Sequence, residues 1–180
     1  MVIKELNLLG CYEIQAKRVE DTRGYFLKFY AESIFERVGI KTKHVELYLS
    51  QSKKNVIRGM HFQVPPREHG KIICCISGEI EDVLLDLRLS STTYGNYQVI
   101  SLDSKSDKAL FIAPGIAHGF ISKSDQAVVL YGVSSEYSEE HDHGIRWDSF
   151  GYDWGCISDP IISKRDQMLP KFNRAIKIFI

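Results

Sequence analysis

Residues 71–88 read KIICCISGEIEDVLLDLR, and this stretch decides the fold class. It holds two short runs of β-branched and aliphatic residues with a serine-glycine turn between them. In the second run Val83, Leu85 and Leu87 share one face, because successive side chains of a strand point to opposite sides. Similar runs, separated by turn residues, cover 25–30, 44–50, 56–62, 71–77, 80–88, 96–102, 110–113, 118–122 and 127–133. This spacing predicts an all-β sandwich or barrel.

Little helix is expected outside these strands. Residues 31–38 carry apolar side chains at helical spacing, and Gly39 is typical of a residue that ends a helix. Residues 136–180 contain several glycines and prolines, which indicates loops and short helices packed against the strands. The chain of 180 residues shows no linker, so we expect one domain that spans residues 1–180.

The composition excludes several classes of protein. Lys plus Arg and Asp plus Glu number 23 each, so the chain has no overall basic field that would attract nucleic acid. No apolar run approaches the roughly 20 residues that a membrane span needs, and residues 1–6 are too charged for a secretory signal. The chain has four cysteines, Cys11, Cys74, Cys75 and Cys156. They form no CxxC pair, which argues against a zinc or redox site and favours free thiols in the cytoplasm.

Chemistry-bearing residues gather in two segments. Residues 58–63 read RGMHFQ and are followed by Gly70-Lys71, which places Arg58, His61 and Lys71 on neighbouring predicted strands. A base, an anion binder and a fixed cation close together suit proton abstraction beside a carbonyl group, where the cation stabilises the enolate oxygen. A second segment with residues suited to such chemistry is APGIAHGF at residues 113–120, which contains His118. Tyr131 follows it in the next predicted strand.

Several ordered motifs resemble those of a known family. RGMHFQ, the following GK, DVLLDLR, APGIAHGF, GIRWDS and the late Ser163-Lys164-Arg165-Asp166 are similar to the nucleotide-sugar 3,5-epimerases typified by dTDP-4-dehydrorhamnose 3,5-epimerase. The resemblance covers about residues 21–170. It implies an all-β, cupin-type jelly roll (a double-stranded β-helix) with a few short helices.

The resemblance also implies the reaction. The substrate is a nucleoside-diphosphate 4-keto-6-deoxy sugar, and no metal or organic cofactor takes part. A base removes a proton at C3, at C5 or at both, and a proton returns from the opposite face of the enolate. The products would feed deoxysugar synthesis for surface polysaccharides such as the O-antigen of lipopolysaccharide. A homodimer is expected, in which residues 6–15 extend the sheet of the partner.

Roles follow from the positions that match the family's motifs. His61 matches the base, Asp166 the carboxylate that orients it, Lys71 the cation at the enolate oxygen and Tyr131 the proton donor. The residues that match contacts to the nucleotide, its phosphates or the sugar are Arg23, Phe26, Lys28, Arg58, His118, Asp142 and Arg165.

Three positions depart from the family's pattern. Glu46 and Tyr48 lie where the family has glutamine and asparagine, so the pocket is altered. Lys28 lies where the family has a glutamate that contacts the base. The ring nitrogen of cytosine accepts a hydrogen bond and suits an ammonium donor, whereas thymine and guanine present a ring N–H. The nucleotide therefore stays open among dTDP, CDP and GDP.

Two other classes of protein compete with an epimerase. A metal-dependent cupin oxygenase or isomerase needs a second histidine where this chain has Gln63, and His61 with His118 alone make a poor metal site. A non-catalytic sugar-nucleotide-binding cupin would not need His61, Lys71, Tyr131 and Asp166 together. Single residues also have plainer explanations: His61 alone could be a core histidine. We expect His69, His141 and His143 in exposed loops.

Overall fold

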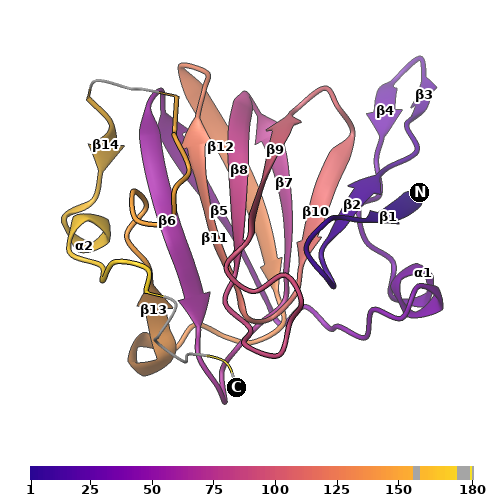
Figure 1. Ribbon diagram of the computed structural model, residues 1–180. Helices are drawn as coiled ribbons and strands as arrows, with labels where there is room; N and C mark the ends of the chain where they lie inside the picture. Colours follow the sequence, from indigo (N-terminus) through magenta and orange to yellow (C-terminus); the bar gives the residue numbers. More distant parts are fainter. Residues whose placement is uncertain (156–158, 174–178, 180) are drawn as a thin grey trace.

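Two antiparallel β-sheets face one another in the computed structural model, which describes residues 1–155, 159–173 and 179 (Figure 1). The first sheet has the order β1 (Val2–Glu5), β2 (Tyr12–Gln15), β10 (Lys108–Ile112), β7 (Lys71–Ser77), β12 (Gln126–Val133) and β5 (Glu46–Lys53). The second has the order β13 (Asp142–Gly144), β6 (Val56–Gln63), β11 (Ile116–Ser122), β8 (Glu79–Asp86) and β9 (Tyr97–Asp103), and β14 (Ile161–Ile162) pairs with β6 in parallel. A separate hairpin joins β3 (Val19–Asp21) to β4 (Gly24–Phe26).

Alternation along β8 divides the core as the sequence predicts. Leu84 points between the sheets, where it packs with Ile73 of β7 and Phe120 of β11. Val83 and Leu85 point to the other side of the second sheet, where the segment that carries Trp154 covers them. The hydrophobic effect thus stabilises the position of β8 from both sides, since each face of the strand buries apolar surface against a different layer.

The prediction of an all-β fold is confirmed, and the strand predicted at 71–77 matches β7 residue for residue. The predicted helix at 31–38 is α1 (Glu32–Arg37), and Gly39 follows it with φ of 82°. Its apolar face is narrower than the spacing suggested, because Phe35 is buried and Val38 is 42% exposed.

Some boundaries differ from the prediction. Of the strand expected at 25–30, only Tyr25 and Phe26 have strand geometry, at the end of β4. Residues 136–180 contain η1 (Glu139–His141) and α2 (Lys164–Gln167) as expected, but also β13 and β14. Both strands pair with β6, so contacts with a long neighbouring strand make these short segments extended, and their own sequence pattern does not. Residues 6–15, expected to extend a partner's sheet, include β2, which pairs with β10 of its own chain.

Two glycines bring β6 and β11 unusually close. Gly59 has φ of 121°, and a Cβ on it would lie 2.5 Å from the Cα of Gly119. Any other residue at position 59 would therefore need both a strained backbone and a wider strand spacing. The close approach lies two residues before His61, which is opposite His118 in the strand register.

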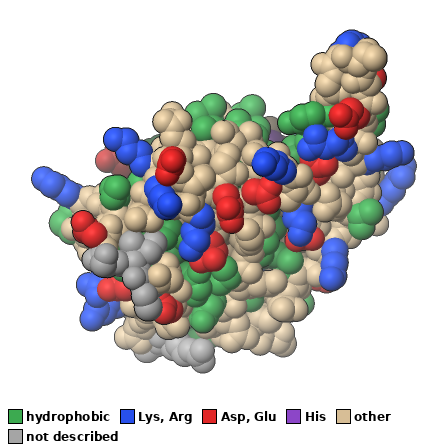
Figure 2. Space-filling view, turned by 90° about the horizontal axis from the view of Figure 1, so that it is seen from above, with side chains coloured by type: hydrophobic (Ala, Val, Ile, Leu, Met, Phe, Trp, Pro, Cys, Tyr) green, Lys and Arg blue, Asp and Glu red, His purple; other side chains and the backbone are tan. Residues whose placement is uncertain are grey.

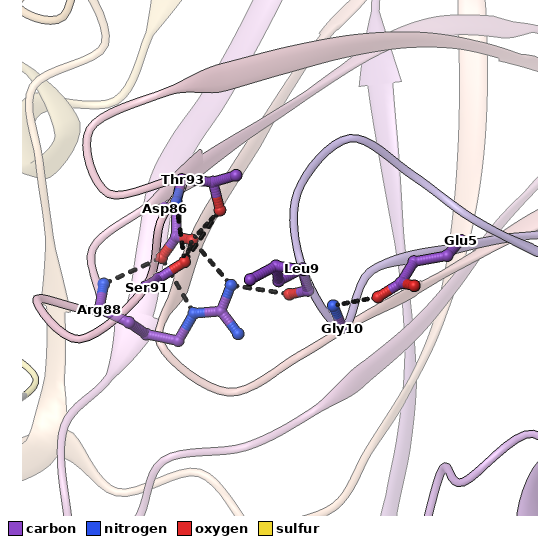
Figure 3. A network of polar contacts seen from close by, with 7 residues as sticks. All are labelled: Glu5, Leu9, Gly10, Asp86, Arg88, Ser91 and Thr93. Atoms are coloured by element: carbon purple, nitrogen blue, oxygen red, sulfur yellow. Dashed lines mark hydrogen bonds and ion pairs between the residues drawn. The ribbon is translucent and has the colours of Figure 1, made fainter.

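A buried polar network fixes the loop that follows β8 (Figure 3). The Asp86 carboxylate accepts hydrogen bonds from the Arg88 guanidinium and from the hydroxyls of Ser91 and Thr93, all at 2.6 to 2.9 Å. Arg88 also donates to the carbonyl oxygen of Leu9 at 2.7 Å, which ties the amino-terminal segment to this loop. The charges of Asp86 and Arg88 thus pair with each other, as charges largely excluded from water require.

The surface carries both signs of charge. Figure 2 shows Lys and Arg side chains intermingled with Asp and Glu over the face seen from above, in keeping with their equal numbers. In the part of the chain that the structure describes, no helix is long and apolar enough to cross a membrane. Cys11, Cys74 and Cys75 are buried free thiols, and Cys156 lies outside the described residues.

Candidate active site

A cavity of about 320 Å³ is lined by residues of both sheets. Strands β5, β7 and β12 supply one part of its wall, and β6, β11 and β13 supply another. Its polar lining residues are Glu46, Tyr48, Ser50, Arg58, His61, Gln63, His69, Lys71, His118, Tyr131, Ser135, Tyr137, Asp142 and Arg165. This volume falls in the range of small-molecule sites.

The ring of His61 is oriented by a hydrogen bond to a carboxylate. Its Nε2 lies 2.8 Å from Oδ1 of Asp166, which is buried on α2. The other carboxylate oxygen accepts from the Gly59 backbone N–H at 3.2 Å. Burial raises the pKa of the Asp166 carboxyl, but the hydrogen bonds from His61 and Gly59 outweigh it and hold the pKa below its ordinary value. An ionised carboxylate only accepts, so neutral His61 carries its proton on Nε2 and keeps the lone pair on Nδ1.

Lys71 is a buried cation at the first position of β7. Its side chain donates from Nζ to the carbonyl oxygen of His61 at 3.2 Å, and the residue is only 5% exposed. Burial lowers the pKa of Lys71 to about 8, although Asp142 and Asp82 oppose this shift. A poorly solvated ammonium group is well placed to stabilise a negative charge that develops nearby.

A second histidine–carboxylate pair lies deeper in the structure. Nε2 of His118 is 2.8 Å from Oδ2 of Asp82, and both side chains are buried. Burial lowers the pKa of His118 even though Asp82 raises it, which favours the neutral ring. Oδ1 of Asp82 has no hydrogen-bond partner among the described residues. The sequence held a signal for Asp82, because it is an acidic residue inside an apolar strand.

Tyr131 presents a neutral hydroxyl in the cavity wall. Burial raises the pKa of this phenol well above its ordinary value, so the hydroxyl keeps its proton at neutral pH. Its oxygen lies 3.4 Å from Oγ of Ser50 on β5. The ring stacks on that of Tyr48, with centroids 4.8 Å apart.

Two arginines lie at the edge of the cavity. Arg58 is exposed and donates to Oγ of Ser52 and to the Gln51 carbonyl oxygen, both at 2.9 Å. Arg165 pairs with Asp142 at 2.6 Å, and half of its side chain is exposed. Guanidinium groups in this setting are suited to the phosphates of a nucleotide.

Three of the sequence-predicted residues lie elsewhere. Arg23, Phe26 and Lys28 are exposed and do not line the cavity of their own chain. Arg23 forms an ion pair with Asp21 in the β3–β4 hairpin. Figure 1 shows this hairpin on the side of the molecule opposite α2, the helix that carries Asp166.

The expectation that His69 lies in an exposed loop is wrong, because the residue is half-buried and lines the cavity. The buried amide of Gln63 lies 3.2 Å from its Nδ1, and burial lowers the pKa of His69 to about 3. Gln63 also accepts from the Ser138 backbone N–H and donates to the Arg67 carbonyl oxygen, so it ties two loops to the end of β6. The sequence did not indicate these contacts, which depend on how the loops return to the strand.

Among the residues that the structure describes, no three His, Cys, Asp or Glu side chains lie together as a metal site. The cavity instead combines a histidine paired with a carboxylate, a buried lysine and a protonated tyrosine. Such a set belongs to enzymes that remove and return protons.

Comparisons with known proteins agree with this class. The family model of dTDP-4-dehydrorhamnose 3,5-epimerase matches residues 5–174. A dTDP-4-dehydrorhamnose 3,5-epimerase of Methanothermobacter thermautotrophicus is 38% identical over 165 residues, which cover 89% of each protein. A dTDP-4-dehydrorhamnose 3-epimerase of Streptomyces niveus is 35% identical over 170 residues. The match covers 93% of this chain and 82% of that protein.

Solved structures show the same fold. The crystal structure of dTDP-4-dehydrorhamnose 3,5-epimerase from Bacillus anthracis, with TDP and PPi bound, has a TM-score of 0.91 and 30% identity; the match covers 95% of this chain and 99% of that one. The architecture is the cupin-type jelly roll that the resemblance of the motifs implied. The chain belongs to the dTDP-4-dehydrorhamnose 3,5-epimerase family and is an isomerase of the carbohydrate epimerase class.

Proposed function

We propose that the cavity epimerises a nucleoside-diphosphate 4-keto-6-deoxy sugar at C3, at C5 or at both, for deoxysugar biosynthesis. The observation that carries this proposal is the 2.8 Å pair of His61 and Asp166 in a cavity that also contains Lys71 and Tyr131. The relatives support it, because they are dTDP-4-dehydrorhamnose 3,5-epimerases or 3-epimerases by name.

His61 acts as the base in this proposal. The C4 carbonyl acidifies the neighbouring C–H, Nδ1 of His61 takes the proton, and the electron pair moves onto the carbonyl oxygen as an enolate. Asp166 stabilises the imidazolium that results. The Lys71 ammonium stabilises the enolate oxygen.

Tyr131 acts as the acid. Its O–H bond breaks, the new C–H bond forms on the face opposite His61, and the carbonyl is restored. The tyrosinate then regains a proton from solvent, and His61 releases the one that it removed. The raised pKa of Tyr131 keeps it protonated before each turnover.

Arg58, His118, Asp142 and Arg165 would contact the rest of the substrate, with the two arginines on the phosphates. The names of the relatives support a dTDP-linked sugar as the substrate. One Legionella pneumophila structure that is 27% identical contains dTDP-4-keto-L-rhamnose. Lys28 favours a cytosine nucleotide instead, because an ammonium group can donate to the ring nitrogen of cytosine.

A homodimer would give Arg23, Phe26 and Lys28 a site to contact. Their hairpin is exposed, with Tyr25 and Phe26 at 57% and 60%, and the outer face of β5 exposes Leu47 and Leu49 at 70% and 61%. Apolar surface of this extent is typical of an interface. Light scattering at micromolar concentration should give twice the chain mass, and a monomer would contradict the proposal.

The decisive experiment follows the reaction in deuterium oxide. Purified protein is incubated with dTDP-, CDP- and GDP-linked 4-keto-6-deoxy sugars, and NMR records deuterium uptake at C3 and C5. Uptake with inversion at one or both carbons is expected for one nucleotide. No uptake with any of the three would overturn the proposed function.

The three free thiols described above also support a cytoplasmic location, which cell fractionation would test.

A further inference from the structure

Tyr48 lies directly opposite Tyr131 where β5 pairs with β12. The two rings are 4.8 Å apart between centroids and only 14° from parallel, so one face of Tyr131 is covered by Tyr48. Tyr131 is 6% exposed, whereas Tyr48 is 40% exposed and also lines the cavity. The stack therefore has an inner ring, that of Tyr131, and an outer ring, that of Tyr48, which covers it.

Two further contacts of Tyr131, one polar and one between rings, are weaker than the stack. Its hydroxyl is 3.4 Å from Oγ of Ser50, beyond the 2.5 to 3.0 Å or so of a good O–H···O bond. The His118 ring meets it edge-on, with centroids 6.2 Å apart. The stack with Tyr48 is the closer of the two ring contacts, and aromatic pairs at such distances favour a defined relative orientation.

The hydroxyl of Tyr48 is not required for this contact. Burial raises the pKa of Tyr48 to about 12, with smaller contributions from Glu46 and Asp142, so the ring is neutral at physiological pH. What Tyr48 offers to Tyr131 is a flat apolar surface.

We propose that Tyr48 is a positioning residue, which holds the ring of Tyr131 in the orientation that returns a proton to the substrate. This inference rests on the function proposed above, in which Tyr131 is the acid and His61 the base. Proton removal by His61 does not depend on the stack, whereas proton return does. Loss of Tyr48 should therefore separate the two half-reactions.

The test compares Tyr48→Ala with Tyr48→Phe in deuterium oxide, using a dTDP-linked 4-keto-6-deoxy sugar as the probe. NMR measures the rate of deuterium uptake and the rate of inversion separately. In Tyr48→Ala the ratio of inversion to uptake should fall roughly 10- to 100-fold, since misplacing a catalytic group by about 1 Å can have an effect of this size. The decrease should appear in kcat, with KM within about threefold. Tyr48→Phe should restore the ratio to within about twofold.

Tyr97→Ala is the matched control, because Tyr97 on β9 is also a tyrosine, is 41% exposed and does not line the cavity. Tyr48→Leu keeps apolar bulk without a flat ring, and it replaces Tyr48→Ala if that variant does not fold. An unchanged ratio in the alanine or leucine variant would overturn the role of Tyr48. So would a decrease in Tyr48→Phe as large as that in Tyr48→Ala, because the hydroxyl would then be the required group. If the wild-type protein catalyses no deuterium uptake from solvent into any of the three nucleotide sugars, the proposed function is overturned instead.

Discussion

Asp166 and His61 lie 105 positions apart in the sequence and meet at 2.8 Å between Oδ1 and Nε2. Ser163 caps α2 by accepting from the Asp166 backbone N–H at 3.0 Å, which fixes the short helix that carries the carboxylate. The parallel pairing of β14 with β6 brings this segment beside the strand that carries His61. The orientation of the proposed base thus depends on two distant parts of the chain, β6 and the segment that runs from β14 to α2.

We predict that His61→Asn abolishes both deuterium uptake and inversion. Asparagine has no group that can take a proton at neutral pH, and general bases commonly contribute about 10²- to 10⁴-fold. Binding of the free nucleoside diphosphate, measured by calorimetry, should stay within about threefold. The control is His143→Asn, since His143 is exposed and does not line the cavity. Wild-type uptake in His61→Asn would show that another residue is the base.

Asp166→Asn should reduce turnover less than His61→Asn does. The base is still present, but an amide neither stabilises the imidazolium nor fixes the proton on Nε2 as an ionised carboxylate does. We expect a decrease of about 10- to 100-fold in kcat, with a melting temperature close to that of the wild type. A loss as complete as in His61→Asn would indicate that Asp166 takes part in proton transfer itself.

Tyr131→Phe should lose inversion more than deuterium uptake. His61 can still remove a proton and return solvent deuterium to the same face, whereas the opposite face has lost its donor. The two rates are measured together by NMR, as above. Equal loss of both would mean that Tyr131 is needed before the enolate forms. Ser50→Ala serves as a comparison, because it removes only the long contact to the Tyr131 hydroxyl.

The pH profile should show the titration of Lys71. Since burial lowers the pKa of Lys71 to about 8, the cation is lost as pH rises through 8, well below the 10.4 or so of a solvated lysine. The kcat/KM of the proposed reaction should therefore fall with rising pH near 8. Lys71→Met should have low activity and lack this decrease. Constant kcat/KM up to pH 10 would contradict the role of Lys71 as a cation.

The same shift has a consequence for stability with the opposite sign. Between pH 8 and about 10.4 the unfolded chain keeps the Lys71 proton and the folded chain releases it. The unfolded state then binds more protons, so the contribution of Lys71 to the free energy of unfolding increases with pH in this window.

The sequence predicted the features that depend on local patterns. Alternation in residues 80–88 indicated which side chains of β8 share a face, and the RGMHFQ motif indicated His61 on a strand. It did not predict β13, whose three residues are extended because β6 pairs with them. Nor did it predict that His69 lines the cavity, since this depends on the loops that Gln63 holds together. Long-range contacts of this kind leave no periodic signal in the chain.

Base selectivity gives a prediction for Lys28. If its ammonium group faces the base, CDP should bind more tightly than dTDP, and Lys28→Glu should shift the preference toward dTDP by about tenfold. Calorimetry with the free diphosphates measures this, and Lys17→Glu supplies the same charge change before the β3–β4 hairpin. Equal affinities that the substitution leaves unchanged would show that Lys28 does not contact the base.

The Asp86 network should contribute more to stability than an exposed ion pair does (Figure 3). Burial raises the pKa of Asp86, but the hydrogen bonds from Arg88, Thr93 and Ser91 outweigh it and lower the pKa overall. Asp86→Ala leaves the Arg88 cation without its partner, and removing one member of a buried pair typically costs about 3 to 5 kcal/mol. Asp148→Ala removes a partly exposed partner of Arg146 and should cost about 1 kcal/mol or less.

Urea unfolding at neutral pH measures both losses, and its pH dependence gives a second test. Because the folded pKa of Asp86 is lowered, its stabilisation is present above the unfolded value near 3.9 and is lost as pH falls through the folded value. The difference in unfolding free energy between wild type and Asp86→Ala should therefore shrink below about pH 4. A difference that stays constant through this range would show that packing around the carboxyl group, and not its charge, stabilises the loop.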